Sequence, residues 1–456
     1  MRDLILYPPV LGTILVGLVA SFIVLFNLTK DKAIASVFQQ IVVYGFLFIV
    51  SGVAIFPFSH LNLASLGTPE KSLFSGVLLL LLYAAVFVLL RVRIKQILTN
   101  IIILFQQKYL GIYLGLIIFS AFWSETHWLT LKAAISLIFI SGFAVCFARI
   151  YNWKQIFKLL SCNQIIIAFF CAFMAIFVPS EGQTDKGWAG AVGHPIDLGN
   201  MMALTAALWL LNAIQNSKYR WRSLLFCIIS ITIMQLANSA GAFVVFLSVT
   251  VIVFIPPIFR RLNFLQANFL FTVILLIFAV PSIWLFSNLD NTMSLLGKDM
   301  TFTGRVPLWN LLIEQNISER LWFGYGYSGF WQPWQGSDNP AAAIFRLIGD
   351  WAVHAHNGFL DIILSVGLIG FVVFALSFLS NVSRAIKLIF SNRSPESVLP
   401  LILLTYVFMT NLSHSPIVMP NYVWFLYVLT TVRLHINTVT KRGSFRWRQQ
   451  LSKQHV

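Results

Sequence analysis

Long apolar stretches separated by short polar segments run along nearly the whole chain. Most of them reach the roughly 17 to 25 residues that an α-helix needs to cross a bilayer. Because lipid offers the backbone no hydrogen-bond partner, this pattern predicts transmembrane helices rather than strands. Two of the stretches are short, 109–123 and 397–412, which leaves a count of twelve to fourteen spans open. The thirteen expected spans cover residues 10–28, 36–57, 73–90, 109–123, 127–148, 157–178, 196–215, 222–237, 240–256, 264–287, 356–382, 397–412 and 418–434.

The composition supports the same class, an all-α polytopic membrane bundle. Hydrophobic residues make up 58% of the 456 residues, charged residues only 10%, and the mean hydropathy is +0.83. A soluble domain carries roughly 25% charged residues. The excess of 31 basic over 15 acidic residues fits cationic cytoplasmic loops. We expect no nucleic-acid partner, because no basic run interleaved with aromatic residues occurs before the C-terminal tail.

The distribution of Lys and Arg predicts which loops face the cytoplasm. One alternating set of loops, with the tail from Arg433, holds 23 of the 31 basic residues, and the opposite set holds seven. Since basic residues accumulate in cytoplasmic loops, the first set is expected there. An odd number of spans then places the N-terminus outside, and the long segment 288–355 also falls on the external side.

This topology divides the chain into four regions. They are an N-terminal transmembrane bundle (1–287), a large external loop (288–355), C-terminal transmembrane helices (356–434) and a basic cytoplasmic tail (435–456). Within the loop, the spacing of apolar residues predicts short amphipathic helices over 304–317 and 341–351.

The external loop is rich in aromatic residues, among them Trp309, Tyr325 and Trp331. Aromatic planes on an external surface can stack on sugar rings, which makes these three residues candidates for substrate binding. The alternative is a belt of aromatic side chains at the membrane interface, where Trp and Tyr gather in any case.

The stretch 353–370, VHAHNGFLDIILSVGLIG, places His356 and Asn357 directly before an apolar run. In a helix that starts at Asn357, Gly367 lies about 20° from His356 around the axis, and Gly370 about 40° to the other side. This predicts a smooth groove below a titratable imidazole, since small residues allow a helix or a lipid chain to approach. The alternative is a histidine that only caps a helix. Asp361 points elsewhere and is expected to be structural.

Cations that could bind an anion lie on both sides of this stretch. Arg305 precedes the helix expected at 304–317, and a guanidinium beside a helix N-terminus suits phosphate. Arg346, on the second short helix, is a candidate second contact. Lys186 and His194 lie in an external patch at the mouth of the 196–215 span, where ionisable residues tend to face a cavity. The alternatives are ordinary surface cations and a turn with a capping acid.

The sequence gives little support to a metal or a nucleotide cofactor. No HExxH motif, no clustered His or Cys ligands and no paired acids occur in the external segments, and no Walker-type loop occurs. The four cysteines are spread along apolar segments without a CxxC pair, so neither a disulfide framework nor a metal site is expected. We therefore expect no cofactor.

Several motifs resemble those of a known family. His356-Asn357, nine residues and then Gly367-x-x-Gly370 resemble the H-[NSQ]-x9-G-x-x-G signature of bacterial O-antigen ligases and repeat-unit polymerases. The TGRVPLW, GYGYSGFW and HAHNGFLD segments look especially like the exopolysaccharide polymerase branch, as does WAGAVGHPIDLGN at 188–200. The resemblance covers roughly residues 185–375.

The resemblance implies a metal-independent, GT-C-like glycosyltransferase of the bacterial inner membrane that acts on the periplasmic side. The donor would be a glycan on undecaprenyl diphosphate and the acceptor a sugar hydroxyl, with His356 catalytic and Arg305 a diphosphate ligand. Ligases usually carry a further arginine before the 196–215 span, where this chain has Lys186. That difference favours repeat-unit polymerisation over ligation to lipid A-core.

A rival of another class is a transporter or flippase for lipid-linked sugars. It would need ionisable residues along a path at mid-membrane depth, whereas this chain gathers its polar groups on the external side. A polymerase would further imply a flippase and a chain-length regulator as partners, besides the lipid-linked glycans and membrane lipid.

Overall fold

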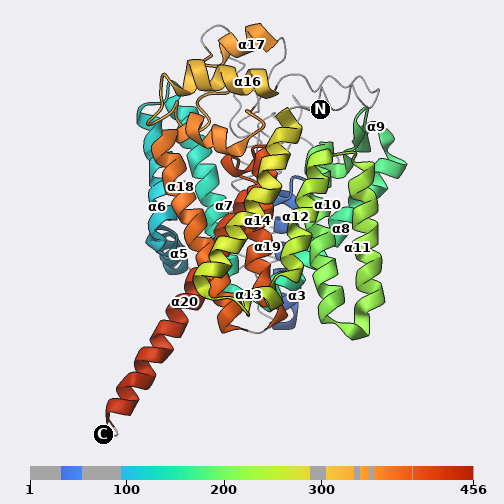
Figure 1. The fold of residues 1–456 in the computed structure, drawn as a ribbon, viewed down its shortest axis with the longest axis vertical. Coiled ribbons are helices and arrows are strands. Elements are labelled where there is room, and N and C mark those ends of the chain that lie inside the picture. Colours follow the sequence, from blue (N-terminus) through green and yellow to red (C-terminus); the bar gives the residue numbers. More distant parts are fainter. Residues whose placement is uncertain are drawn as a thin grey trace, which may run out of the picture.

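The computed structural model describes residues 32–53, 94–287, 305–332, 339–348, 354–392 and 394–454. Helices dominate these residues and form a bundle, which confirms the predicted all-α polytopic fold (Figure 1). The described residues contain one small antiparallel hairpin, β1 (Gln183–Thr184) with β2 (Gly187–Trp188). The spans predicted at 10–28 and 73–90 lie outside the described residues.

Every predicted span that falls on described residues overlaps a helix. Six of these helices are by themselves long and apolar enough to cross a membrane, and a seventh span is possible where two helices meet at a bend of 106°. The helices of the bundle are α3 (Lys32–Val50), α6 (Lys108–Phe119), α7 (His127–Ile150), α8 (Trp153–Phe177), α10 (Pro195–Gln215), α11 (Arg220–Leu236), α12 (Ala240–Phe254), α14 (Phe264–Ser287), α18 (Gly358–Ser391), α19 (Leu399–Ser413) and α20 (Tyr422–Gln454).

Shorter helical segments connect them. These are α5 (Ile94–Gln106), α9 (Pro179–Gly182), α13 (Pro256–Phe259), and 3₁₀ turns at Ser120–Phe122, Gly190–Val192, Ser217–Tyr219, Pro395–Val398 and Pro416–Val418. The sequence pattern did not predict α5, which lies before the bend and meets α6 there.

Local sequence explains where several helices begin. Asn152 and Gln155 form a reciprocal capping box at the start of α8, which satisfies two backbone donors that the first turn leaves free. Ser239 caps α12 in the same way through one hydrogen bond. Pro195 occupies the first position of α10, where its missing N–H costs nothing.

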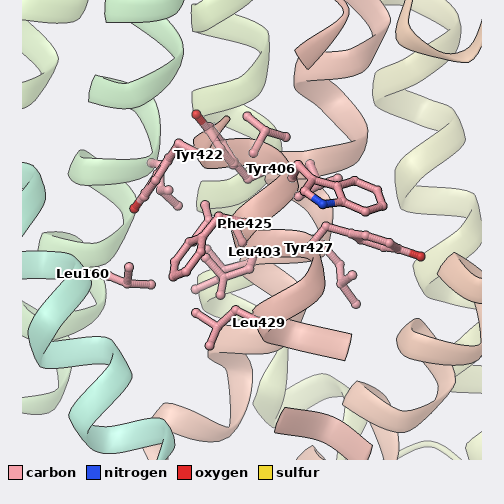
Figure 2. Packing of buried hydrophobic residues seen from close by; sticks show 14 of the residues in the cluster. Leu160, Leu403, Tyr406, Tyr422, Phe425, Tyr427 and Leu429 are labelled. Atoms are coloured by element: carbon pink, nitrogen blue, oxygen red, sulfur yellow. The ribbon is translucent and has the colours of Figure 1, made fainter. Parts of the chain in front are cut away.

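Helix α19 lies at the centre of the bundle and is buried on all sides, so its sequence has no polar face. In the most apolar 18-residue stretch that includes α19, 89% of the residues are buried. In the corresponding stretch of α14, at the periphery, 22% are buried. Leu403 and Tyr406 of α19 pack near Phe425 and Tyr427 of α20 in the same buried cluster (Figure 2). α14 therefore exposes apolar side chains of the kind that lipid would cover.

The two ends of the bundle differ. α13 and the free end of α20 lie at one end, and α9, α16 (Arg305–Leu311) and α17 (Ala342–Ile348) lie at the other (Figure 1). This separation agrees with the predicted alternation of basic and external loops. α20 continues without a break through residue 434, where the prediction ended the last span and began the tail.

Both helices predicted in the external loop are present, α16 followed by a π-helical turn at Leu312–Ile317, and α17. Together with residues 321–331 they enclose a second, small hydrophobic core around Leu312, Phe330 and Ile344. The loop is thus an ordered cap over one end of the bundle in its described parts.

Helix α18 is broken near its start. Val366 and Gly367 leave helical geometry, and Gly367 has φ of +70°. Residues of the external loop fill the break, since the backbone N–H of Tyr325 donates to the carbonyl of Leu364 (2.7 Å) and that of Leu368 to the carbonyl of Leu321 (2.8 Å). The loop and the helix therefore share backbone hydrogen bonds.

Candidate active site

The segment 354–357 forms a tight loop directly before α18. Asn357 caps the helix, because its Oδ1 accepts hydrogen bonds from the backbone N–H groups of Phe359 (3.0 Å) and Leu360 (3.4 Å). The N–H of Gly358 donates to the carbonyl of His414 at the end of α19 (3.1 Å). The loop is thus attached to two helices of the bundle.

The carboxylate of Asp361, in the first turn of α18, fixes this loop through hydrogen bonds. Its Oδ2 accepts from the N–H of Ala355 (2.9 Å) and its Oδ1 from the indole N–H of Trp331 (2.7 Å). From the other side, the indole of Trp309 donates to the carbonyl of Ala355 (2.8 Å). The acid in the apolar run is therefore structural, as expected, and it fixes the residue before His356.

His356 is presented in an unusual backbone conformation, with φ of +52°, a region that non-glycine residues rarely occupy. Its backbone N–H donates to Nδ1 of His354 (3.0 Å). Its own Nδ1 is buried and has no hydrogen-bond partner within the described part of the chain. Such strain and unpaired polarity are typical of functional sites.

Burial lowers the pKa of His356 to about 3, and the positive charge of Arg305 contributes next. The imidazole is therefore neutral near pH 7. Burial also lowers the pKa of His354 well below its ordinary value, with the neighbouring histidines and Arg305 adding to the effect.

Arg305 is the first residue of α16 and is only 8% exposed. Burial lowers the pKa of its guanidinium to about 10, so it remains charged near neutral pH. Because this charge lowers the pKa of both His354 and His356, Arg305 lies within electrostatic reach of both rings. The structure therefore brings together two residues that the sequence placed 51 positions apart.

The start of α10 contacts His414, next to this loop. His194 caps this helix by accepting from the N–H of Ile196 (3.2 Å), and its ring stacks on that of His414 with 6.1 Å between centroids. Asp197 lies 3.5 Å from Nε2 of His414. Lys186, exposed in the turn between β1 and β2, lies close enough for its charge to lower the pKa of His194 and of His356.

The predicted glycine groove below His356 is wrong. The helix begins at Gly358, after His356, and its break at Gly367 invalidates a straight-helix projection. A side chain at Gly367 would meet the carbonyl oxygen of Trp322 at 2.0 Å. Glycine is required there for the close approach of the external loop, and not for a lipid chain.

Two of the predicted sugar-stacking residues have another role. Trp309 is 9% exposed and Tyr325 is 4% exposed, and both belong to the core of the external loop. Neither presents an open ring face, because the apolar surface of the loop packs inward. Trp331 is half-buried against Asp361. Arg346 is exposed, and its Nε donates to Ala342 within its own helix (3.4 Å).

The structure brings together three histidines that the sequence analysis did not group. Ring nitrogens of His354, His356 and His414 lie within 4.8 Å of one another. The sequence did not reveal this cluster, because His414 lies at the end of a different helix. The only available signal was its position in a polar NLSHSP segment directly after a span.

Comparison with known proteins adds two findings. Residues 225–375 match a family model described as O-antigen ligase, and this range contains Arg305 and His356. The chain is also similar to the exopolysaccharide production protein ExoQ of Rhizobium meliloti (strain 1021), with 26% identity over 234 residues. That match covers 51% of this chain and 46% of the relative, so the chain spans about half of that protein's length.

Proposed function

We propose that this chain, which is similar over residues 225–375 to an O-antigen ligase family model and over about half of its length to an exopolysaccharide production protein, is an inner-membrane glycosyltransferase that polymerises lipid-linked repeat units of a surface polysaccharide. One observation carries the proposal. A neutral, half-buried imidazole, that of His356, has a buried Nδ1 without a hydrogen-bond partner among the described residues and lies within electrostatic reach of the buried guanidinium of Arg305.

Arg305 and His356 together can carry out the transfer of a glycan from a lipid diphosphate to a sugar hydroxyl. The donor is a glycan on undecaprenyl diphosphate, so the leaving group is already a diphosphate and no nucleotide is required. Arg305 binds the diphosphate and stabilises the negative charge that grows on it as the glycosidic bond breaks. The negative charge of the bound diphosphate offsets the positive charge of Arg305 and raises the pKa of His356 above its value in the empty site. His356 then takes the proton of the acceptor sugar hydroxyl as the new bond forms. A single displacement of this kind inverts the configuration at the anomeric carbon.

The basic residues support a periplasmic site. They are concentrated in one alternating set of loops, and the cap that carries Arg305 belongs to the opposite set. The free end of α20, which carries the basic tail, lies at the other end of the bundle from α16 (Figure 1). We therefore place transfer on the periplasmic side of the inner membrane, with a flippase and a chain-length regulator as functional partners.

Two observations bear on polymerase versus ligase. The name of the relative refers to exopolysaccharide production, and the segment before α10 offers Lys186 and His194 rather than a second arginine. Both favour polymerisation. The description of the matching family model favours the second candidate, an O-antigen ligase that transfers the glycan to lipid A-core.

Replacement of His356 tests the proposal in cells. We expect His356→Ala to abolish long polysaccharide chains at normal protein level, since loss of a general base slows transfer by roughly 10²- to 10⁴-fold. Chain length is measured by gel electrophoresis, and protein level by immunoblotting. His127→Ala, at an exposed histidine that begins α7, is the matched control and should leave chain length unchanged. Normal chains in the His356 variant would refute the assignment.

A further inference from the structure

Three histidine rings meet at the mouth of α18. The ring centroid of His354 lies 4.2 Å from that of His356 and 4.4 Å from that of His414, and the rings are close to perpendicular. Ring nitrogens of all three lie within 4.8 Å of one another. His354 and His356 lie in the loop before α18, and His414 lies at the end of α19. A hydrogen bond from the N–H of Gly358 to the carbonyl of His414 connects these two segments.

Two of the three rings offer an unused nitrogen. Nδ1 of His356 and Nδ1 of His414 are both buried, and neither has a hydrogen-bond partner among the described residues. A buried acceptor without a partner loses the hydrogen bond that it made with water. A ligand that supplies partners to both nitrogens at once would therefore recover this loss.

His414 also has the neighbour that metal-binding histidines usually have. Its Nε2 faces Oδ1 of Asp197 at 3.5 Å, so the carboxylate favours a proton on Nε2 and leaves the lone pair on Nδ1. Ligating histidines commonly donate their second ring N–H to a carboxylate, which fixes the tautomer and the orientation of the ring.

We propose that His354, His356 and His414 form a binding site for a divalent first-row transition metal ion of the zinc class, with Asp197 orienting His414. Imidazole nitrogens suit this class of ion, and three histidines leave a fourth coordination position open. An ion bound there engages His356 and thereby blocks transfer. Only this inhibitory effect rests on the function proposed above, since metal binding itself does not require it.

Charged side chains around the three rings act on a bound cation with both signs. The charge of Arg305 opposes a cation, and the carboxylates of Asp197 and Asp361 offset it in part.

Binding also requires a small rearrangement. Nitrogens around a tetrahedral zinc ion are separated by about 3.3 Å, from Zn–N distances of roughly 2.0 to 2.1 Å. The rings must therefore move closer. In addition, the hydrogen bond from the backbone N–H of His356 to Nδ1 of His354 must break. If Nε2 of His354 binds the metal, its proton moves to Nδ1, which can then no longer accept a hydrogen bond; if Nδ1 binds the metal, its lone pair is used.

The test uses purified full-length protein in detergent, prepared with an affinity tag that contains no histidine. Zn²⁺ binding is measured by isothermal titration calorimetry, and Co²⁺ binding by visible absorption. We expect saturable binding of one ion, with a Co²⁺ spectrum of tetrahedral type. A Co²⁺ spectrum of purely octahedral, water-like type in the wild-type protein would overturn the proposal, and this result does not depend on any variant.

Variants then locate the site. His354→Gln and His414→Gln should each weaken Zn²⁺ binding by more than tenfold, and Asp197→Asn by about tenfold as expected for an orienting carboxylate. His127→Gln, outside the cluster, is the control and should bind as the wild type does. Size-exclusion chromatography confirms that each variant is folded. Wild-type affinity in both histidine variants would contradict the assignment.

The inhibitory effect is measured separately, as polysaccharide elongation at buffered free Zn²⁺ concentrations. We expect elongation to fall as the site fills and to recover when a chelator is added. Binding without inhibition would retain the metal site but overturn its effect on transfer. A protein that binds Zn²⁺ and shows no elongation at any metal concentration would instead count against the proposed function.

Discussion

Arg305 keeps its charge in a place that is only 8% exposed, although burial lowers its pKa to about 10. A guanidinium presents a planar fork that matches two phosphate oxygens at once, whereas an ammonium is a point charge on a flexible chain. A buried arginine beside the neutral ring of His356 is therefore the residue that should determine affinity for a diphosphate.

Substitution of Arg305 by Lys tests this role. We expect Arg305→Lys to weaken binding of the lipid-linked donor by at least tenfold, which is about 1.4 kcal/mol, because the bidentate contact is lost. Binding is measured with labelled donor in detergent. Arg320→Lys is the matched control, since Arg320 forms a partly exposed ion pair with Glu125 at 2.7 Å and such pairs contribute little. Equal donor affinity in Arg305→Lys and the wild type would show that Arg305 does not bind the diphosphate.

At the scale of residues, the sequence predicted those candidate site residues that lie within short motifs. His356 and Arg305 could be identified in this way, and the structure brings the ring of His356 within electrostatic reach of Arg305, while the side chain of Asn357 caps α18. His354 and His414 were missed as a pair, because their contact depends on how α18 and α19 pack. The sequence also did not predict which aromatic side chains are buried, and Trp309 is a core residue for this reason.

At the scale of elements, the period and length of the apolar stretches predicted the helices well, because burial and lipid exposure both demand long apolar runs. The same pattern did not predict the break in α18, since Val366 and Gly367 are apolar or small and interrupt no hydrophobic run. The break exists because the external loop inserts residues 321–325 beside it and exchanges backbone hydrogen bonds with the helix.

Gly367 is the residue on which this insertion depends. We expect Gly367→Ala to destabilise the protein by roughly 1 to 3 kcal/mol or more, because alanine strains a positive φ and its Cβ would lie 2.0 Å from the carbonyl oxygen of Trp322. Thermal unfolding in detergent measures the change. Gly115→Ala in α6, where a Cβ would meet nothing within 4 Å, should be neutral or slightly stabilising. Equal stability of Gly367→Ala and the wild type would show that the insertion does not require glycine.

At the scale of the whole molecule, polar chemistry gathers at one end of the bundle. The first turn of α10 and the start of α18 contact the end of α19 there, and α16 contacts the loop before α18 through Trp309. Sequence alone predicted this polarity, since the positions of basic and aromatic residues follow the two sides of a membrane. It could not predict how helices far apart in the chain surround the site, because that depends on packing.

The most direct test of a polymerase is elongation by the purified protein in lipid vesicles, with the lipid-linked repeat unit as the only glycan substrate. We predict that the wild-type protein forms products of two or more repeat units without lipid A-core, and that His356→Gln does not. Translocation of the repeat unit without a new glycosidic bond, or transfer only after lipid A-core is added, would contradict the account.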